Sequence, residues 1–194
     1  MDAKVQKSKS GDQWQNGDII FHSSDSRQCQ AIELATDSKF SHVGMIVFHR
    51  GQWMVAEAVQ PVRFTPVKDF IRRGDGDYVV SRLKNQADRI SDDDAKKLLE
   101  EAKKYEGKDY DIKFMWGDNE LYCSELVWLL YERVLGIELC DLRPLNDYQL
   151  GHPVVRQQLE ARYGVNLPLD EKMVSPEDIY RSSLLVTVEK VGFH

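Results

Sequence analysis

The chain has 194 residues, 42% of them apolar and 30% charged, and its acidic residues outnumber its basic ones 32 to 26, for a formal net charge of −6. A chain of this size can bury a core without disulfides or a structural metal. The acidic balance argues against a general nucleic-acid binder, which would carry a basic stripe, and no apolar run reaches the roughly 18 residues of a membrane span.

Residues 1–16 are polar and rich in lysine, and they lack the apolar centre of a signal peptide. We expect them to form a flexible tail in front of a single domain at 17–194, because no Pro/Gly/Ser-rich stretch divides the remainder. The sequence as it stands predicts a cytoplasmic protein, whereas a chain from which a signal had been cleaved would be periplasmic or otherwise exported.

The first half of the domain has the patterns of β-strands. Short apolar runs predict strands at 19–21, 43–48, 53–59 and 78–83, with a helix at about 25–35. The runs at 43–48 and 53–59 are separated by a four-residue loop containing Gly51, which predicts a hairpin.

Apolar residues at helical spacing dominate the second half. They predict helices at about 92–106 and 123–135, a short helix after 154, a helix start at 175–178 and a final strand at 184–188. Strands followed by helices in one chain indicate an α+β fold.

The three cysteines, Cys29, Cys123 and Cys140, are odd in number and far apart, so no disulfide framework is expected. The five histidines are scattered without the local spacing of a zinc site, and we expect no metal and no cofactor. Cys123 differs from the other two because it opens the helix at 123–135, where unpaired N–H groups stabilise a thiolate. It is therefore a candidate nucleophile, with a buried structural cysteine as the alternative. We interpret Cys29 and Cys140 as structural.

A cysteine nucleophile needs a base, usually histidine, and a third group that orients the base. His42 begins the first strand of the predicted hairpin and is the candidate base. His22 follows the strand at 19–21 directly and is its competitor. Either histidine could instead be an ordinary core or surface residue.

The hairpin places a carboxylate near His42. If Phe48 pairs with Trp53 across the loop, Glu57 lies opposite Gly44, and His42, two residues away, shares their face. Glu57 interrupts an apolar run, and a carboxylate in such a strand needs a partner. A slip of one residue would turn Glu57 to the opposite face, and a charge at the strand edge is the alternative interpretation.

The segment before Cys123 is acidic and aromatic. Carboxylates at 109, 111, 118 and 120 alternate with aromatic residues that include Trp116, and Tyr122 directly precedes the cysteine. This pattern indicates a small peptide or amide substrate with a free amine, or else a solvated acidic loop. Tyr122 and Trp116 are the candidates for substrate binding or for lining an oxyanion site.

Five short segments occur together in a characteristic order: GDIIF at 17–21, SHVGM at 41–45, EAV at 57–59, GKDYD at 107–111 and YCSELV at 122–127. Together they resemble the YiiX/YebB-like proteins, circularly permuted relatives of the NlpC-type cysteine peptidases with a papain-like fold. In unpermuted relatives the cysteine helix comes before the histidine strand, whereas here His42 precedes Cys123. The likeness covers about residues 16–135.

The resemblance implies a catalytic triad of Cys123, His42 and Glu57. It also implies a five- or six-stranded, mostly antiparallel sheet packed on the cysteine helix, with the Cys123 N–H as one oxyanion donor. The implied activity is that of a cysteine hydrolase cleaving an amide bond, in a peptide such as a cell-wall peptide, through an acyl-thioester. A lipid-directed thioesterase or acyltransferase, favoured by an apolar groove beside Cys123, and a non-catalytic binding module are the alternatives.

Overall fold

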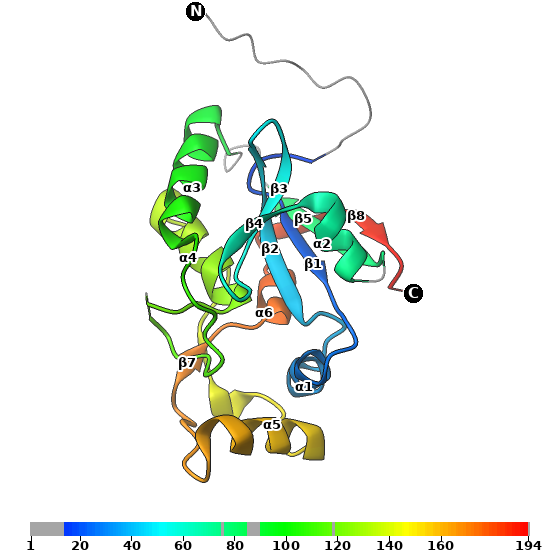
Figure 1. The fold of residues 1–194 in the computed structure, drawn as a ribbon, viewed down its shortest axis with the longest axis vertical. Helices are drawn as coiled ribbons and strands as arrows, with labels where there is room; N and C mark the ends of the chain where they lie inside the picture. Colours follow the sequence, from blue (N-terminus) through cyan, green and yellow to red (C-terminus); the bar gives the residue numbers. More distant parts are fainter. Residues whose placement is uncertain (1–13, 75, 85–89, 118, 194) are drawn as a thin grey trace, which may run out of the picture.

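A computed structural model describes residues 14–74, 76–84, 90–117 and 119–193. In this described part, one six-stranded antiparallel sheet runs through the centre of the molecule in the order β4-β3-β2-β1-β5-β8 (Figure 1). Its strands are β1 (Ile19–His22), β2 (His42–His49), β3 (Gln52–Glu57), β4 (Arg63–Pro66), β5 (Tyr78–Leu83) and β8 (Leu185–Val191). A separate two-stranded sheet joins β6 (Arg143–Pro144) to β7 (Lys172–Met173).

The helices are α1 (Arg27–Thr36), α2 (Val67–Arg73), α3 (Asp92–Tyr105), α4 (Cys123–Leu135), α5 (Pro153–Tyr163) and α6 (Pro176–Tyr180), with a 3₁₀ turn, η2 (Leu145–Asp147). Capping contacts and glycine residues fix several helix ends. The Ser91 side chain accepts the N–H of Asp94 at the start of α3, and Gly136 ends α4 with a positive φ of 66°. No described helix is long and apolar enough to cross a membrane. The expected α+β class and antiparallel sheet are confirmed.

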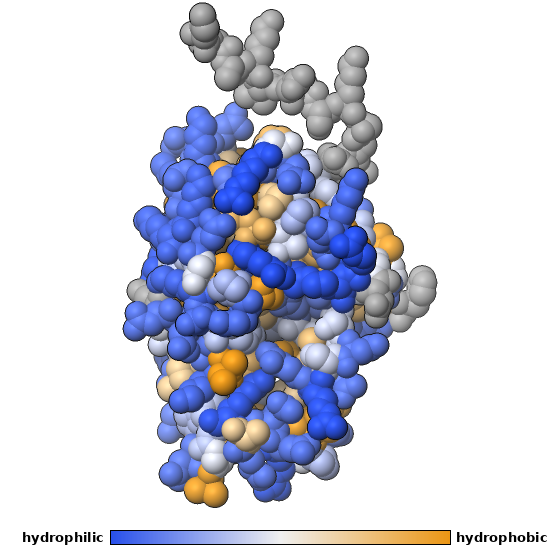
Figure 2. All heavy atoms as spheres, in the orientation of Figure 1, coloured by the Kyte–Doolittle hydropathy of each residue, from blue (hydrophilic) through white to orange (hydrophobic). Residues whose placement is uncertain are grey.

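The two faces of the sheet are covered by different helices. Val43 and Met45 of β2 belong to the apolar core that includes Leu126 of α4, whereas Ile46 packs with Phe70 of α2 on the other face. Side chains alternate along a strand, so the even-numbered residues of β2 point towards α2. The outer surface seen in Figure 2 is mostly hydrophilic, with only small apolar patches.

The segment predicted as a tail falls largely on residues 1–13, which lie outside the described residues. Its last residues contact the sheet. Trp14 Nε1 donates a hydrogen bond to Glu189 Oε2 at 2.9 Å, and Asn16 Oδ1 accepts one from the Phe48 N–H at 2.6 Å. In the structure, residues 14–16 are therefore attached to the domain, because their polar groups satisfy partners on β8 and β2.

The sequence expectations miss the very short β6, β7 and η2 and, next to the hairpin, β4 and α2. The last two are also short, with four and seven residues, and apolar alternation in β4 is limited to the segment around Phe64. They follow the β2–β3 hairpin directly and pack against β3. This position brings them to the carboxylate of Glu57.

Candidate active site

The β2–β3 hairpin has the predicted register. Phe48 lies opposite Trp53 and Met45 lies opposite Ala56. One step further along, Gly44 faces Glu57, and a Cβ added to Gly44 would lie 3.4 Å from the Glu57 Cβ. The register brings His42 and Glu57 to the α2 face, where His42 Nε2 lies 2.6 Å from Glu57 Oε2.

Glu57 is fully buried and surrounded by donors. Arg73 Nη2, at the end of α2, lies 2.6 Å from each carboxylate oxygen, and Thr65 Oγ1 on β4 donates to Oε1 at 2.5 Å. Burial raises the pKa of Glu57, but the bonds from His42 and Arg73 outweigh it and lower the pKa to about 2. The carboxylate is therefore ionised at neutral pH. Arg73 and Thr65 were not among the residues singled out from the sequence.

His42 lies between Glu57 and Cys123. Burial lowers the pKa of His42, whereas a hydrogen bond with Cys123, a second with Glu57 and the negative charges of both raise it to about 9. Because Nε2 faces Glu57, Nδ1 is the nitrogen left for the sulfur. The ring stacks on Phe70 at a centroid distance of 5.5 Å. The surroundings therefore favour a protonated His42 imidazole beside Cys123 and the Glu57 carboxylate.

His22, the competing histidine, lies opposite His42 on β1, with the ring centroids 5.2 Å apart. It is 3% exposed, and its Nδ1 lies 2.9 Å from the Ser23 carbonyl, which fixes Nδ1 as the protonated nitrogen. Its Nε2 is buried and has no hydrogen-bond partner among the described residues. Burial first, and then the charge of His42, lower the pKa of His22 to about 3. His22 is therefore the neutral histidine of the pair.

Cys123 opens α4 and is 2% exposed. The Glu125 carboxylate accepts the N–H groups of Tyr122 at 3.4 Å and Gly117 at 2.9 Å, which caps the helix. The next residue, Ser124, donates its hydroxyl to the Val174 carbonyl at 2.7 Å. These contacts hold the cysteine at the end of the sheet where β2 begins.

Tyr122 and Trp116 have different surroundings. The Tyr122 hydroxyl accepts the Val174 N–H at 3.2 Å, and its ring lines a pocket together with Cys123. The Trp116 ring packs edge-on against Trp128, with centroids 5.3 Å apart, and lines neither of the two pockets beside Cys123 and His42. The structure therefore brings Tyr122, but not Trp116, to the pocket beside Cys123.

The acidic loop before Cys123 uses its carboxylates internally. Asp111 is buried and accepts the N–H groups of residues 113 and 115, and Asp109 accepts a hydrogen bond from Gln60 at 2.6 Å. Asp118 lies outside the described residues, and Glu120 is exposed. Asp109 and Asp111 thus shape the loop that leads to α4.

Two neighbouring pockets flank Cys123 and His42. One pocket is lined by His42 but not Cys123, and its walls combine hydroxyl and amide side chains such as Ser41 and Gln60 with apolar ones such as Val59. The apolar pocket, of about 680 Å³ including its mouth, is lined by Cys123 but not His42. Ile32 of α1 lines both pockets, so they adjoin each other.

Comparisons with known proteins find close similarity over most of the chain. A family model described as "permuted papain-like amidase enzyme, YaeF/YiiX, C92 family" matches residues 13–189. The uncharacterized protein YiiX of Escherichia coli K12 is 43% identical over 177 residues, which are 91% of this chain and 86% of that protein. A crystal structure of yiiX from Escherichia coli O157:H7 has a TM-score of 0.86 at 43% identity and covers 91% of this chain and 97% of its own.

The yiiX protein of that crystal structure is described as a metalloprotein, which raises the question of a metal site in this chain. Within residues 14–74, 76–84, 90–117 and 119–193, no group of three or more His, Cys, Asp or Glu side chains is placed to hold an ion. The His, Cys, Asp and Glu side chains of these ranges are therefore not arranged as a metal site.

Proposed function

Because this chain belongs to the C92 family of permuted papain-like amidases, we propose that it is a cysteine amidase with Cys123 as nucleophile, His42 as base and acid, and Glu57 as the residue that orients His42. The observation that carries this proposal is the 2.6 Å contact between His42 Nε2 and the buried Glu57 carboxylate, with Cys123 beside the same imidazole. Such a chain of sulfur, imidazole and carboxylate matches what a thiol nucleophile requires.

The proposed reaction has two halves. The Cys123 thiolate attacks the amide carbonyl, and the carbonyl oxygen gains a negative charge that the Cys123 N–H at the start of α4 stabilises. The C–N bond then breaks as the His42 imidazolium gives its proton to the leaving nitrogen, which produces a thioester and a free amine. Neutral His42 next takes a proton from water, and the resulting hydroxide cleaves the thioester and restores the thiolate.

We propose a small peptide or amide as the substrate, such as a cell-wall peptide. A free amine on the substrate would have to meet an acceptor other than Asp111, which is buried and whose two oxygens already accept backbone N–H groups. The second candidate function, a lipid-directed thioesterase or acyltransferase, is supported by the apolar pocket beside Cys123. The same three residues would serve it.

The test is to trap the acyl-enzyme. The protein is mixed with p-nitrophenyl acetate and with acetyl-7-amino-4-methylcoumarin, and the adduct is located by peptide mass spectrometry. We expect acetylation of Cys123 in the wild type and none in Cys123→Ala, with Cys140→Ala as the matched control that stays active. Glu57→Gln should slow turnover less than Cys123→Ala, because Glu57 orients rather than reacts. Turnover that survives in Cys123→Ala would refute the proposal, and cleavage of the ester alone would favour the second candidate.

A further inference from the structure

The pocket that is lined by His42 but not by Cys123, called the His42 pocket below, carries positive charge. It has a volume of about 1040 Å³ including its mouth, and its described lining residues include Arg73 and His42 but no Asp or Glu. His42 has a pKa of about 9 and is therefore protonated at neutral pH, whereas His22, which also lines the pocket, is neutral. The wall of the pocket thus suits an anion.

Helix α1 begins at the same pocket. Its N-cap, Ser26, accepts the N–H of Cys29 at 3.1 Å and lines the pocket together with Gln28 from the first turn. The first N–H groups of a helix have no partners within it and carry partial positive charge. The start of α1 therefore adds to the positive potential of the His42 pocket.

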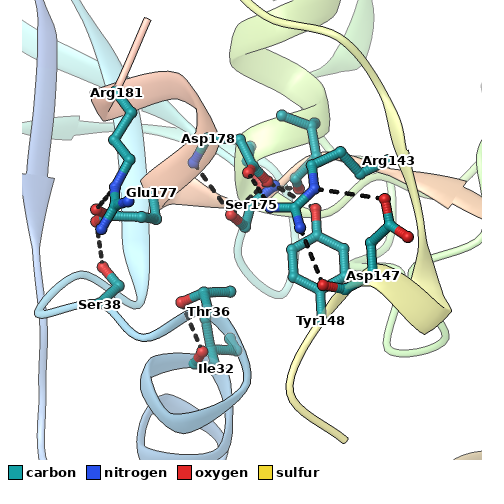
Figure 3. A network of polar contacts seen from close by, with 12 residues as sticks. Ile32, Thr36, Ser38, Arg143, Asp147, Tyr148, Ser175, Glu177, Asp178 and Arg181 are labelled. Carbon is teal, nitrogen blue, oxygen red and sulfur yellow. Dashed lines mark hydrogen bonds and ion pairs between the residues drawn. The ribbon is translucent and has the colours of Figure 1, made fainter.

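The carboxylates near α1 and the loop before α4 have hydrogen-bond donors of their own. Glu33 accepts the Ser23 hydroxyl, and Asp109 accepts a side-chain amide at 2.6 Å. Figure 3 shows a further carboxylate, Glu177, just beyond the opposite end of α1, where it accepts the Ser38 hydroxyl at 2.6 Å. None of these three carboxylates lines the His42 pocket.

Arg73 has donors that the protein does not use. Its Nη2 lies 2.6 Å from each oxygen of Glu57, whereas its Nε has no hydrogen-bond partner among the described residues. The side chain is 34% exposed and lines the His42 pocket, so Nη1 is left for a ligand. A guanidinium is the side-chain group best matched to a carboxylate.

Arg73 also lies close to the reacting nitrogen of His42. Arg73 Nη2 and His42 Nε2 are both 2.6 Å from Glu57 Oε2, so they are at most about 5 Å apart. Arg73 Nη1 and His42 Nδ1 are each two bonds further, which places them within roughly 9 Å of each other. Two hydrogen bonds of about 3 Å, together with the roughly 3 Å between the nitrogen and the carboxylate of an α-amino acid, span this distance.

We propose that Arg73 and the start of α1 bind a carboxylate on the leaving amine, an assignment that rests on the proposed amidase function. The substrate is then a small peptide whose C-terminal residue is released as a free amino acid. The leaving nitrogen must face His42 to receive its proton, and the carboxylate beside it then reaches Arg73. A peptide that continued beyond this residue would place a neutral amide there, which a guanidinium binds less strongly.

Two thiol reagents that differ in charge test this assignment. 2-Carboxyethyl methanethiosulfonate is an anion, and its 2-hydroxyethyl analogue is neutral. With both, the Cys123 thiolate attacks the sulfur that bears the ethyl group, a disulfide forms, and methanesulfinate leaves with the electron pair of the broken S–S bond. The carboxylate oxygens of the anionic adduct lie five bonds from the Cys123 sulfur, as do those of an amino acid in the proposed tetrahedral intermediate.

The measured quantity is the rate with the anionic reagent divided by the rate with the neutral one, relative to the same ratio for 2-mercaptoethanol. Initial rates at Cys123 are read by peptide mass spectrometry, and adducts of Cys29, which lines the His42 pocket, appear on a different peptide. We expect this relative ratio to be about fivefold, the size of a favourable, partly exposed ion pair.

Arg73→Met should remove most of this preference. The matched control is Arg63→Met, because Arg63 Nε also lies near Glu57, at 3.8 Å, but Arg63 does not line the His42 pocket. Both variants lose one positive charge, yet the relative ratio should fall below twofold only in Arg73→Met. If that variant does not fold, the cationic 2-aminoethyl reagent replaces it and should react with wild-type Cys123 more slowly than the neutral reagent, again relative to 2-mercaptoethanol.

The outcomes separate the two claims. If Cys123 reacts with the neutral reagent faster than Cys140 but does not prefer the anion, the carboxylate assignment is wrong and the amidase proposal stands. Equal loss of the preference in Arg63→Met and Arg73→Met also overturns the assignment, and so does a cationic reagent that reacts as fast as the anionic one. If Cys123 is no more reactive than Cys140, the proposed function itself fails, and the assignment fails with it.

Discussion

Acidification should destabilise the protein through His22. Its imidazole is 3% exposed and has a pKa of about 3 in the folded state, against about 6.5 for an unfolded histidine. Between these two values the unfolded chain binds a proton that the folded protein does not. The stabilising contribution of neutral His22 is therefore intact above pH 6.5 and is lost progressively as the pH falls towards 3.

The size of the destabilisation at pH 5 is set by the protonation of His22 in the unfolded chain. At 1.36 kcal/mol per pH unit, the 1.5 units between pH 6.5 and pH 5 correspond to about 2 kcal/mol of unfolding free energy. This free-energy difference does not depend on the pKa of His22 in the folded protein as long as that pKa lies well below 5. The His22 side chain packs closely against Gly74, since a Cβ added to Gly74 would lie 2.7 Å from the His22 Cβ.

Urea unfolding at pH 7, 6 and 5 measures this effect in wild type and His22→Asn, which removes the titrating ring and retains an N–H donor. Between pH 7 and pH 5, the wild type should lose about 2 kcal/mol more than His22→Asn. His152→Asn is the control, because His152 is exposed and asparagine is also a good N-cap for α5. Equal pH dependence in wild type and His22→Asn would refute the reasoning.

Two further substitutions test how the β2–β3 hairpin and its neighbours hold His42 and Glu57 in position. Arg73→Met removes the donor that contacts both oxygens of Glu57, and Arg73 is 34% exposed, so unfolding free energy should fall by roughly 1–3 kcal/mol and turnover should fall with it. Arg73→Lys should recover part of both, and full activity in Arg73→Met would contradict a positioning role. Gly44→Ala places a Cβ 2.3 Å from Val55 Cγ1 and should cost roughly 1–3 kcal/mol, read as a lower Tm. An unchanged Tm would show that the hairpin absorbs the methyl group.

The hairpin was predictable because its signals are local. A four-residue loop between two apolar runs fixed the pairing of Phe48 with Trp53, and alternation then carried Glu57 to the face of His42. The start of α4 at Cys123 was equally readable from apolar spacing.

The partners of Glu57 were not predictable in the same way. Arg73 lies 16 residues further along, on a seven-residue helix whose place against β3 depends on tertiary packing. An apolar strand interrupted by Glu57 indicated that this carboxylate needs a partner, and the arginines before Gly74 are the signal that could have named a further one besides His42. Trp116 was singled out because it lies close to Cys123 in the sequence, yet its ring packs against Trp128. Closeness in the sequence therefore did not predict the contacts of this side chain.

The most direct measurement of the proposed chemistry is the rate at which iodoacetamide alkylates Cys123 between pH 5 and pH 10, in wild type and in His42→Ala. An imidazolium beside the sulfur favours the reactive thiolate. The wild type is therefore predicted to react faster than His42→Ala at neutral pH, and the two rates should converge as the solution becomes alkaline. Cys140 in the same samples provides the internal reference. Superimposable profiles for the two proteins would contradict the pairing of Cys123 with His42.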